Sequence, residues 1–244
     1  MYFNFSNPLM IGLLIVLIIE NIQGVLAKPG GLLGLVLSIP GLLIAISFHE
    51  FAHAWVADKL GDDTPRRQGR LTLNPLAHID PFGVVLLLFA GFGWGKPVEI
   101  NSTNFNRKVS VRGGNALVSL AGPVMNFILA ILFSVIYGLL LAHGGSFLAS
   151  TAGFVVQTAI LYTIQLNVGL GVFNLIPLPP LDGSKILTAI LPQNARIWYE
   201  NHQYILYIVF MVIWLTPIAT YIVSAPISAI NHGLVNIIKM VAGV

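Results

Sequence analysis

The stretch from Gly113 to Leu181 reads GGNALVSLAGPVMNFILAILFSVIYGLLLAHGGSFLASTAGFVVQTAILYTIQLNVGLGVFNLIPLPPL and contains no Asp, Glu, Lys or Arg. A transmembrane helix needs about 20 apolar residues, so this stretch is long enough for two. The segment His143-Gly144-Gly145-Ser146 divides it with residues typical of a turn. The sequence therefore predicts two membrane-spanning helices here, at residues 114–142 and 152–176.

The rest of the chain has the same character. Hydrophobic residues make up 56% of it and charged residues 9%, against about 25% charged residues in an ordinary soluble domain. This composition excludes a soluble globular protein and a disordered one. Four further apolar stretches predict spans, which makes six in all, with a break near Ser224-Ala225-Pro226. The four stretches are residues 8–27, 32–60, 203–223 and 227–243.

The segment between the second and third spans is polar, apart from the short apolar stretch Phe82–Phe92. That stretch is too short for a simple span, and its length is typical of a re-entrant or interfacial segment. Arg70–Leu73 and Pro97–Ile100 are interpreted as short strands. The predicted fold is an all-α polytopic membrane protein with about six transmembrane helices and a short re-entrant, β-like segment. Residues 1–244 form a single domain in this interpretation.

The basic residues predict an orientation. If Phe82–Phe92 does not cross, all Lys and Arg residues except Lys28 lie on one side of the membrane. That side is cytoplasmic by the positive-inside rule, and both termini lie there in a multi-pass protein of the cell membrane. The formal net charge of +3 then belongs to cytoplasmic loops. No basic stripe with interleaved aromatic residues is present, so nucleic acid is not an expected partner.

The second span contains the segment His49-Glu50-Phe51-Ala52-His53. Histidines four positions apart lie on one face of a helix and can bind one metal ion. Glu50 lies beside them, where it can take a proton from water at the metal. The chain has no cysteine, so any metal site must use His, Asp or Glu. Ionisable residues this deep in an apolar helix are costly and are candidates for function.

A catalytic zinc usually has three protein ligands, and Asp182 is the best candidate for the third. It follows the proline-rich segment 174–181, whose prolines end the preceding helix. From spacing alone, Asp182 is equally well interpreted as the N-cap of a following helix. The topology favours the ligand, because Asp182 and the two histidines lie toward the same face in the six-span arrangement.

Four other polar residues each have two interpretations. Asn126, inside the third span, could bind an oxyanion or the substrate backbone, or it could pin two helices together. Asn174 allows the same pair of roles. His78 and Asp80 could form a second metal or proton site, but ordering of their loop is favoured, because Asp80-Pro81 is typical of a turn.

Three motifs in this order resemble the site-2 protease family of intramembrane zinc metalloproteases. They are HEFAH at 49–53, AGPVMN at 121–126 and NLIPLPPLDG at 174–183, and GRLTLNPLAHIDPFG at 69–83 is similar to a bacterial branch of that family. The resemblance covers residues 40–190. It implies one Zn²⁺ per chain bound by His49, His53 and Asp182, with Glu50 as the general base. It also implies cleavage of a transmembrane segment of a membrane protein, often a regulatory one, without an inserted PDZ-like or CBS-like domain.

Hydrolysis within a membrane requires that the substrate helix unwinds, since a helix hides its amides in its own hydrogen bonds. The unwound segment is expected to lie beside residues 70–73 or 97–100 by strand addition. Two other functions remain open. One is a metal-handling or ion-transporting protein with His and Asp along an ion path, and the other is a catalytically inactive adaptor of the same fold. A hydrolase requires Glu50, whereas an ion path does not.

Overall fold

The computed structural model describes residues 30–90, 95–106, 108–214 and 216–244, together with residues 19, 23–25, 27 and 28. The predicted first span, residues 8–27, falls almost wholly outside the described residues. The helices are, in chain order, α2 (Gly31–Lys59), α3 (Thr64–Arg67), η1 (Pro75–Ala77), α4 (Pro81–Ala90), η2 (Ser102–Asn104), α5 (Val111–His143), η3 (Gly145–Ala149), α6 (Thr151–Asn174), α7 (Asp182–Ile190), α8 (Gln193–Asn201), α9 (Gln203–Trp214) and α10 (Ile218–Ala242).

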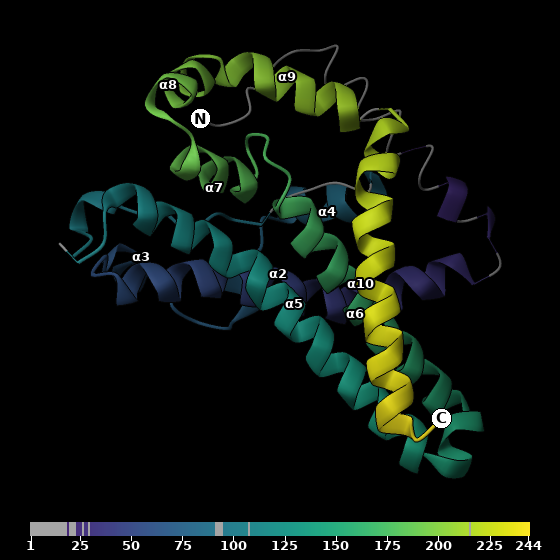
Figure 1. The fold of residues 1–244 in the computed structure, drawn as a ribbon. Coiled ribbons are helices and arrows are strands. Elements are labelled where there is room, and N and C mark those ends of the chain that lie inside the picture. The colour runs from purple at the N-terminus through teal and green to yellow at the C-terminus, as the bar shows by residue number, and fades with distance from the viewer. Residues whose placement is uncertain are drawn as a thin grey trace.

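Four of these helices are long and apolar enough to cross a membrane, namely α2, α5, α6 and α10 (Figure 1). α2, α5 and α6 confirm the predicted spans at 32–60, 114–142 and 152–176. The three pack against one another, and α10 packs along α5 and α6. The predicted all-α membrane fold is therefore confirmed over the described part of the chain.

The predicted boundary between the last two spans is wrong. α9 ends at Trp214, and α10 runs without a break through the predicted turn, with Pro226 inside it. The chain bends instead before Pro217, which is the N-cap of α10. Proline disfavours helical backbone at the residue before it and cannot donate an N–H, which explains a helix start here. α9, with 12 residues, is about 18 Å long and too short to cross the hydrocarbon core.

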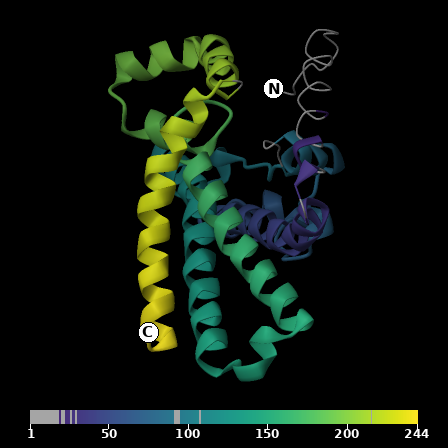
Figure 2. The ribbon, with the colours of Figure 1, turned by 90° about the vertical axis from the view of Figure 1, so that its right-hand side faces the viewer.

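The single long helix α10 also gives the carboxyl terminus a different position from the predicted one. A Cβ atom built on Gly138, near the end of α5, would lie 2.8 Å from the Cβ of Val241, near the end of α10. α10 therefore ends beside the turn that joins α5 to α6 (Figure 2). Among the described residues after α6, α10 is the helix long enough to cross, so the carboxyl terminus lies at the same end of the bundle as the 143–151 turn, and the side of the membrane on which the termini lie stays a prediction.

The two predicted strands are also wrong, since residues 70–73 and 95–101 form no β-ladder. The guanidinium of Arg70 donates to the carbonyl oxygens of Lys96 and Pro97, and the N–H of Val98 donates to Glu50. The backbone groups that a ladder would use are thus bonded to side chains. The apolar stretch predicted between them, Phe82–Phe92, forms α4 over its described residues. The 10 residues of α4 agree with a segment that does not cross, and its re-entrant position stays a prediction.

The interior of the helical bundle is built from apolar and small residues. One core cluster joins α5, α6 and α10 through Ala130, Ile164, Val168, Val172 and Leu234. The helices also approach closely at glycines, and a Cβ on Gly41 of α2 would lie 2.8 Å from the Cα of Thr163 in α6. Small residues allow such approach between membrane helices.

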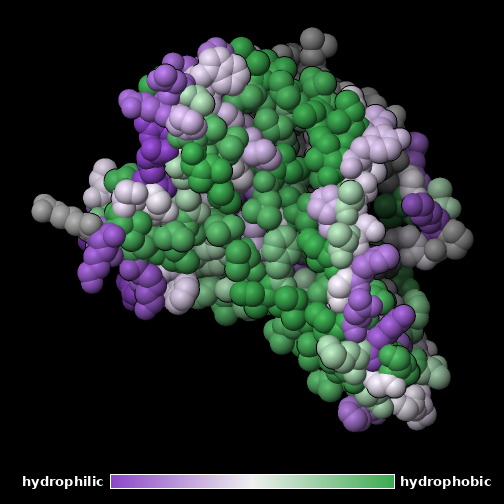
Figure 3. Space-filling view, in the orientation of Figure 1, coloured by the Kyte–Doolittle hydropathy of each residue, from purple (hydrophilic) through white to green (hydrophobic). Residues whose placement is uncertain are grey.

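The outer surface of α5 is largely apolar as well, whereas α10 shows polar residues on the face seen in this view (Figure 3). Large hydrophobic side chains are exposed along the length of α5, among them Leu117, Ile128, Ile131 and Leu139. An apolar surface of this extent is stable in contact with lipid and not in contact with water. The chain is a membrane protein.

Candidate metal centre

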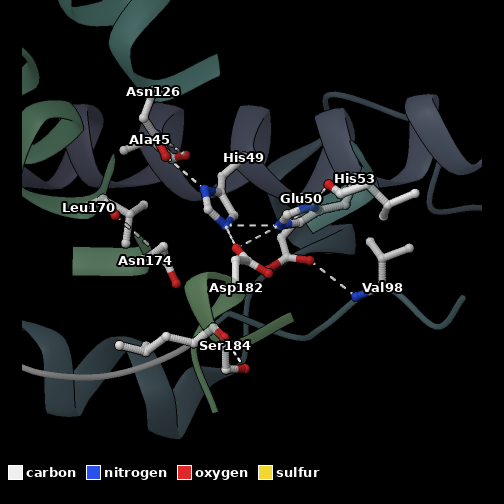
Figure 4. Close-up of polar contacts among 12 residues, drawn as sticks. Ala45, His49, Glu50, His53, Val98, Asn126, Leu170, Asn174, Asp182 and Ser184 are labelled. Carbon is white, nitrogen blue, oxygen red and sulfur yellow. Dashed lines mark hydrogen bonds and ion pairs between the residues drawn. The ribbon is translucent and has the colours of Figure 1, made fainter. Parts of the chain in front are cut away.

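The metal-binding motif of α2 meets the start of α7 in the middle of the molecule. His49 and His53 are 5% and 8% exposed, and the Nε2 atoms of the two rings lie 3.0 Å apart. Oδ2 of Asp182 lies 3.2 Å from Nε2 of His49 and 3.1 Å from Nε2 of His53 (Figure 4). The structure therefore brings the side chains of residues 49, 53 and 182 together around one point, where they could hold a metal ion.

Asn126 determines which nitrogen of His49 carries the proton. The amide nitrogen of Asn126 donates both its hydrogens, one to the carbonyl oxygen of Ala45 and one to Oδ1 of Asn167. Its Oδ1 is therefore an acceptor, and it lies 2.7 Å from Nδ1 of His49. His49 must carry its proton on Nδ1, which leaves a lone pair on Nε2.

His53 is oriented in the same way by the backbone of α5. Its Nδ1 lies 2.6 Å from the carbonyl oxygen of Val118, a group that can only accept a hydrogen bond. Nδ1 is therefore the donor, and the lone pair of Nε2 faces Asp182. Metal-binding histidines usually donate their second ring nitrogen to such a carbonyl or amide, which fixes the tautomer and the ring orientation.

When both imidazoles are neutral, two Nε2 lone pairs and a carboxylate oxygen converge on one point, and a cation bound there offsets their mutual repulsion. Ligands placed tetrahedrally at about 2.0–2.1 Å from Zn²⁺ lie about 3.3 Å from one another, close to the separations of 3.0, 3.1 and 3.2 Å found here. The residues present therefore fit a zinc ion.

Asp182 is not a helix cap. Leu181 occupies the N-cap position of α7, and Asp182 is the first residue of the helix, with no capping hydrogen bond from a side chain. A bound cation lowers the pKa of a carboxyl group beside it, so Asp182 is suited to bind a metal ion as a carboxylate.

Glu50 lies beside the cluster and is held by one oxygen only. Its Oε2 accepts a hydrogen bond of 3.1 Å from the backbone N–H of Val98. The segment that carries Val98 is in turn held by the buried Arg70 through the carbonyl oxygens of Lys96 and Pro97. This arrangement orients the Glu50 carboxylate and leaves Oε1 for a second partner.

The remaining predicted residues lie outside the metal cluster. Asn174 donates to the carbonyl oxygen of Leu170 in its own helix, 3.1 Å away, and makes no hydrogen bond with the ligands. His78 is fully buried and its Nε2 donates to the carbonyl oxygen of Thr72, while burial lowers its pKa and keeps it neutral. Oδ1 of Asp80 accepts from the N–H of Gly83 at the start of α4. These contacts agree with loop ordering by His78 and Asp80.

The sequence analysis does not identify two residues that contact or support the metal centre. Asn167 of α6 is fully buried and supports Asn126; an amide in a charge-free span was the available signal. Gly122 of α5 faces both rings, since a Cβ there would lie 2.5 Å from Cε1 of His49 and 2.6 Å from Nε2 of His53. Glycine is common in membrane helices, so its role is evident only from the contact.

The comparisons with known proteins agree with this geometry. The family model described as "Peptidase family M50" matches residues 37–148 and 142–217, a region that contains all three ligands and Glu50. This chain belongs to peptidase family M50, the site-2 protease family. This match confirms the resemblance to the site-2 protease family that the three sequence motifs indicate.

Named relatives cover most of the M50 chain. It is 41% identical over 203 residues to a Bacillus subtilis protein described as "Putative zinc metalloprotease YwhC", which spans 83% of this chain and 90% of that protein. It is 32% identical over 186 residues to a Mycolicibacterium smegmatis protein described as "Putative zinc metalloprotease Rip2", which spans 75% of this chain and 68% of that protein. No solved structure matches the M50 chain.

Proposed function

We propose that this M50 chain is a zinc metalloendopeptidase that hydrolyses a peptide bond in or near a transmembrane segment of a membrane protein, with a regulatory protein as its substrate. The observation that carries the proposal is the convergence of His49, His53 and Asp182 beside the carboxylate of Glu50. The names of the relatives, which are described as zinc metalloproteases, support the metal and the reaction. One Zn²⁺ per chain fits this ligand set.

The depth of the centre supports a substrate within the membrane. Asp58 is the first charged residue after the HEFAH motif, and it follows His49 by nine positions, or about 13 Å of helix. α2 is apolar on the amino-terminal side of His49 as well. The scissile bond must therefore reach the metal below the surface of the membrane, in an unwound segment whose amides are free of helical hydrogen bonds.

Each residue of the centre has a role in the proposed reaction. When bound, zinc supplies a Lewis acid that polarises the scissile carbonyl and makes a water molecule more acidic. Glu50 accepts the proton of the attacking water at Oε1 while Val98 holds Oε2, and it then passes that proton to the leaving amine. Asn126 keeps His49 in the tautomer that presents Nε2 to the metal.

Asn174 is proposed as a substrate contact. Its amide nitrogen is bonded within α6, which leaves its carbonyl oxygen available beside the metal centre (Figure 4). An acceptor there suits the N–H of an extended substrate backbone. Asn126 is proposed to support the metal ligand, because all of its hydrogen-bonding groups have partners in the protein.

The orientation of the chain is also a proposal. The polar segment 58–112 and the basic residues of α7 and α8 are placed on the cytoplasmic side by the positive-inside rule. The turn at 143–151 then lies on the opposite side, and the carboxyl terminus lies there with it, because α10 ends beside α5. Residues 1–244 are proposed to act as one membrane domain, within a lipid bilayer.

The two rival functions have less support. An ion pathway needs groups that release the ion readily, whereas the second ring nitrogens of His49 and His53 are anchored in the way typical of a permanent site. An inactive adaptor needs no ligand set, and all three ligands and Glu50 are present here. Hydrolysis is the function that uses every residue of the centre.

The decisive experiment compares the wild type with Glu50→Gln. Glutamine keeps the size and an acceptor oxygen for the N–H of Val98, but it cannot take a proton from water. We expect zinc content and folding to be unchanged and cleavage of a single-span substrate in liposomes to fall by about 10²–10⁴-fold. His49→Ala should also lose activity, but together with its zinc. Cleavage by zinc-loaded Glu50→Gln at the wild-type rate would contradict the proposal and favour metal handling.

A further inference from the structure

A cleft lies directly beside the metal centre. It is formed by the first turns of α5, by α7, by α8 and by the segment around residues 98–102, and its volume is about 380 Å³. Its inner wall includes Val98 and Val118. Val98 donates to Glu50 and Val118 accepts from His53, so the inner end of the cleft adjoins both the general base and a metal ligand.

The outer wall of the cleft is basic. Arg112, Lys185 and Arg196 line it, and Glu200 is the acidic side chain among them. Because Glu200 offsets one of the three positive charges, the lining carries a net charge of about +2 at neutral pH. The other polar residues of the lining are small hydrogen-bonding groups such as Ser102, Asn115 and Thr188.

Two of these basic side chains have charged N–H groups without a hydrogen-bond partner among the described residues. Lys185 is exposed and forms no ion pair with any described residue. Nε of Arg196 is buried without a hydrogen-bond partner, and it lies 3.8 Å from Glu200, too far for a hydrogen bond. Arg112 is held in place by carbonyl oxygens at the end of α7, including that of Ala189 at 2.7 Å. A buried polar group without a partner is costly unless a ligand supplies one.

The cleft follows the two helices that carry the site. Lys185 lies three positions after the ligand Asp182 on α7, so both lie on one face of that helix. Arg112 lies six positions before Val118 on α5, or about 9 Å of helix. A fully extended polypeptide covers that length in about three residues.

We propose that this cleft binds an acidic side chain of the substrate, about three residues from the scissile bond on the side of residues 58–112. The inference rests on the proposed proteolytic function and adds a specificity to it. A substrate is favoured over a free anion as the occupant, because Val98 and Val118 belong both to the cleft wall and to the surroundings of the metal centre, so a chain bound at the centre passes beside the cleft. A carboxylate satisfies the unpaired donors of Lys185 and Arg196.

The test is a single-span reporter substrate whose cleavage releases a soluble domain. The five residues flanking the scissile region on the cytoplasmic side are randomised, and released products are sequenced after co-expression with each enzyme variant. The variants are wild type, Lys185→Glu, Arg196→Glu and Glu50→Gln. Lys108→Glu is the matched control, because Lys108 is exposed, does not line the cleft and gives the same change in net charge.

Wild type and Lys108→Glu should enrich Asp and Glu about tenfold over Asn and Gln near the third flanking position. Lys185→Glu and Arg196→Glu should lose this enrichment and favour Lys or Arg there, whereas Lys108→Glu keeps the wild-type preference. The same flank preference in wild type and both charge-reversed variants would overturn the inference and leave the proteolytic function standing. No release above the Glu50→Gln level from any substrate would overturn the proposed function and this inference with it.

Discussion

Asn126 is the side chain on which the geometry of His49 depends. Its amide nitrogen bonds to Ala45 and Asn167, and its oxygen therefore accepts from His49. We expect Asn126→Leu to lower zinc affinity by about 10–100-fold, because leucine keeps the volume but frees the ring to rotate or change tautomer. Zinc competition with a chelator on the purified protein measures the effect. Asn174→Ala is the matched control, and it should leave zinc affinity unchanged while lowering kcat/KM. Equal zinc affinity in Asn126→Leu and wild type would contradict the role assigned to Asn126.

At this scale the sequence predicts the residues whose spacing is local. His49, Glu50 and His53 lie within one turn of helix, so periodicity alone places them together. Asp182 follows them by more than a hundred residues, and its spacing left two interpretations open until α7 placed it against both rings. The contact of Val98 with Glu50 has no signal in the sequence, because a backbone N–H is present at almost every position.

The close approach of α2 and α5 depends on Gly122. A Cβ at this position would lie within 2.7 Å of atoms in both ligand rings, and the rings are fixed by their own hydrogen bonds. We expect Gly122→Ala to reduce zinc occupancy at least tenfold and to abolish activity, because the added methyl group occupies the space where the ligand atoms meet. Metal analysis of the purified variant is the measurement. Gly169→Ala on α6 is the control, since nothing lies within 4 Å of the added Cβ there. Full zinc occupancy in Gly122→Ala would mean that α2 and α5 are farther apart than described.

The turn after α2 is held by one buried carboxylate. Asp62 accepts hydrogen bonds from Thr64, from the N–H of Asn101 at 2.7 Å and from the side chain of Asn104. Burial alone would raise the pKa of Asp62, but these hydrogen bonds lower it below its ordinary value. We expect Asp62→Ala to cost about 1–3 kcal/mol of stability at neutral pH, because several buried donors lose their acceptor.

The same lowered pKa predicts how that loss depends on pH. A carboxyl group with a lowered folded pKa stabilises the protein above its unfolded pKa of about 3.9, and the stabilisation is lost as the pH falls through the folded value. The difference in thermal stability between wild type and Asp62→Ala should therefore shrink between pH 7 and about pH 3. A difference that grows on acidification would refute the ionised state of Asp62.

Element boundaries show where sequence patterns stop being informative. The long spans were predictable because a charge-free stretch of sufficient length has few alternatives. The sequence predicts the break between the last two spans near Ser224-Ala225-Pro226, whereas α9 ends at Trp214 and α10 begins after its N-cap Pro217. A proline inside a membrane helix is tolerated when the rest of the helix packs well, so composition cannot decide between the two prolines. The predicted strands failed because the side chains of Arg70 and Glu50, distant in sequence, bind the backbone groups that pairing would need.

The whole molecule differs from its predicted arrangement in the path of its last helix. With one long helix after α6, the carboxyl terminus and the turn at 143–151 lie at the same end of the bundle (Figure 2). Most of the basic residues still lie together, since Lys239 at the end of α10 separates from the polar segment 58–112 but the basic residues of that segment and of α7 and α8 do not change. The positive-inside rule therefore gives the same orientation for the catalytic face as before.

Single-cysteine labelling tests this arrangement cleanly, because the chain has no cysteine of its own. Cysteines at Lys108, Ser146 and Val244 report the polar segment, the turn and the carboxyl terminus, and all three positions are exposed. In intact cells, an impermeant thiol reagent should label Ser146→Cys and Val244→Cys, and Lys108→Cys should react only after the membrane is opened. Labelling of Val244→Cys together with Lys108→Cys would mean that α9 and α10 cross as two spans. Labelling of Lys108→Cys in intact cells would instead reverse the catalytic face, and the cleft beside the metal would then receive a substrate from the opposite side of the membrane.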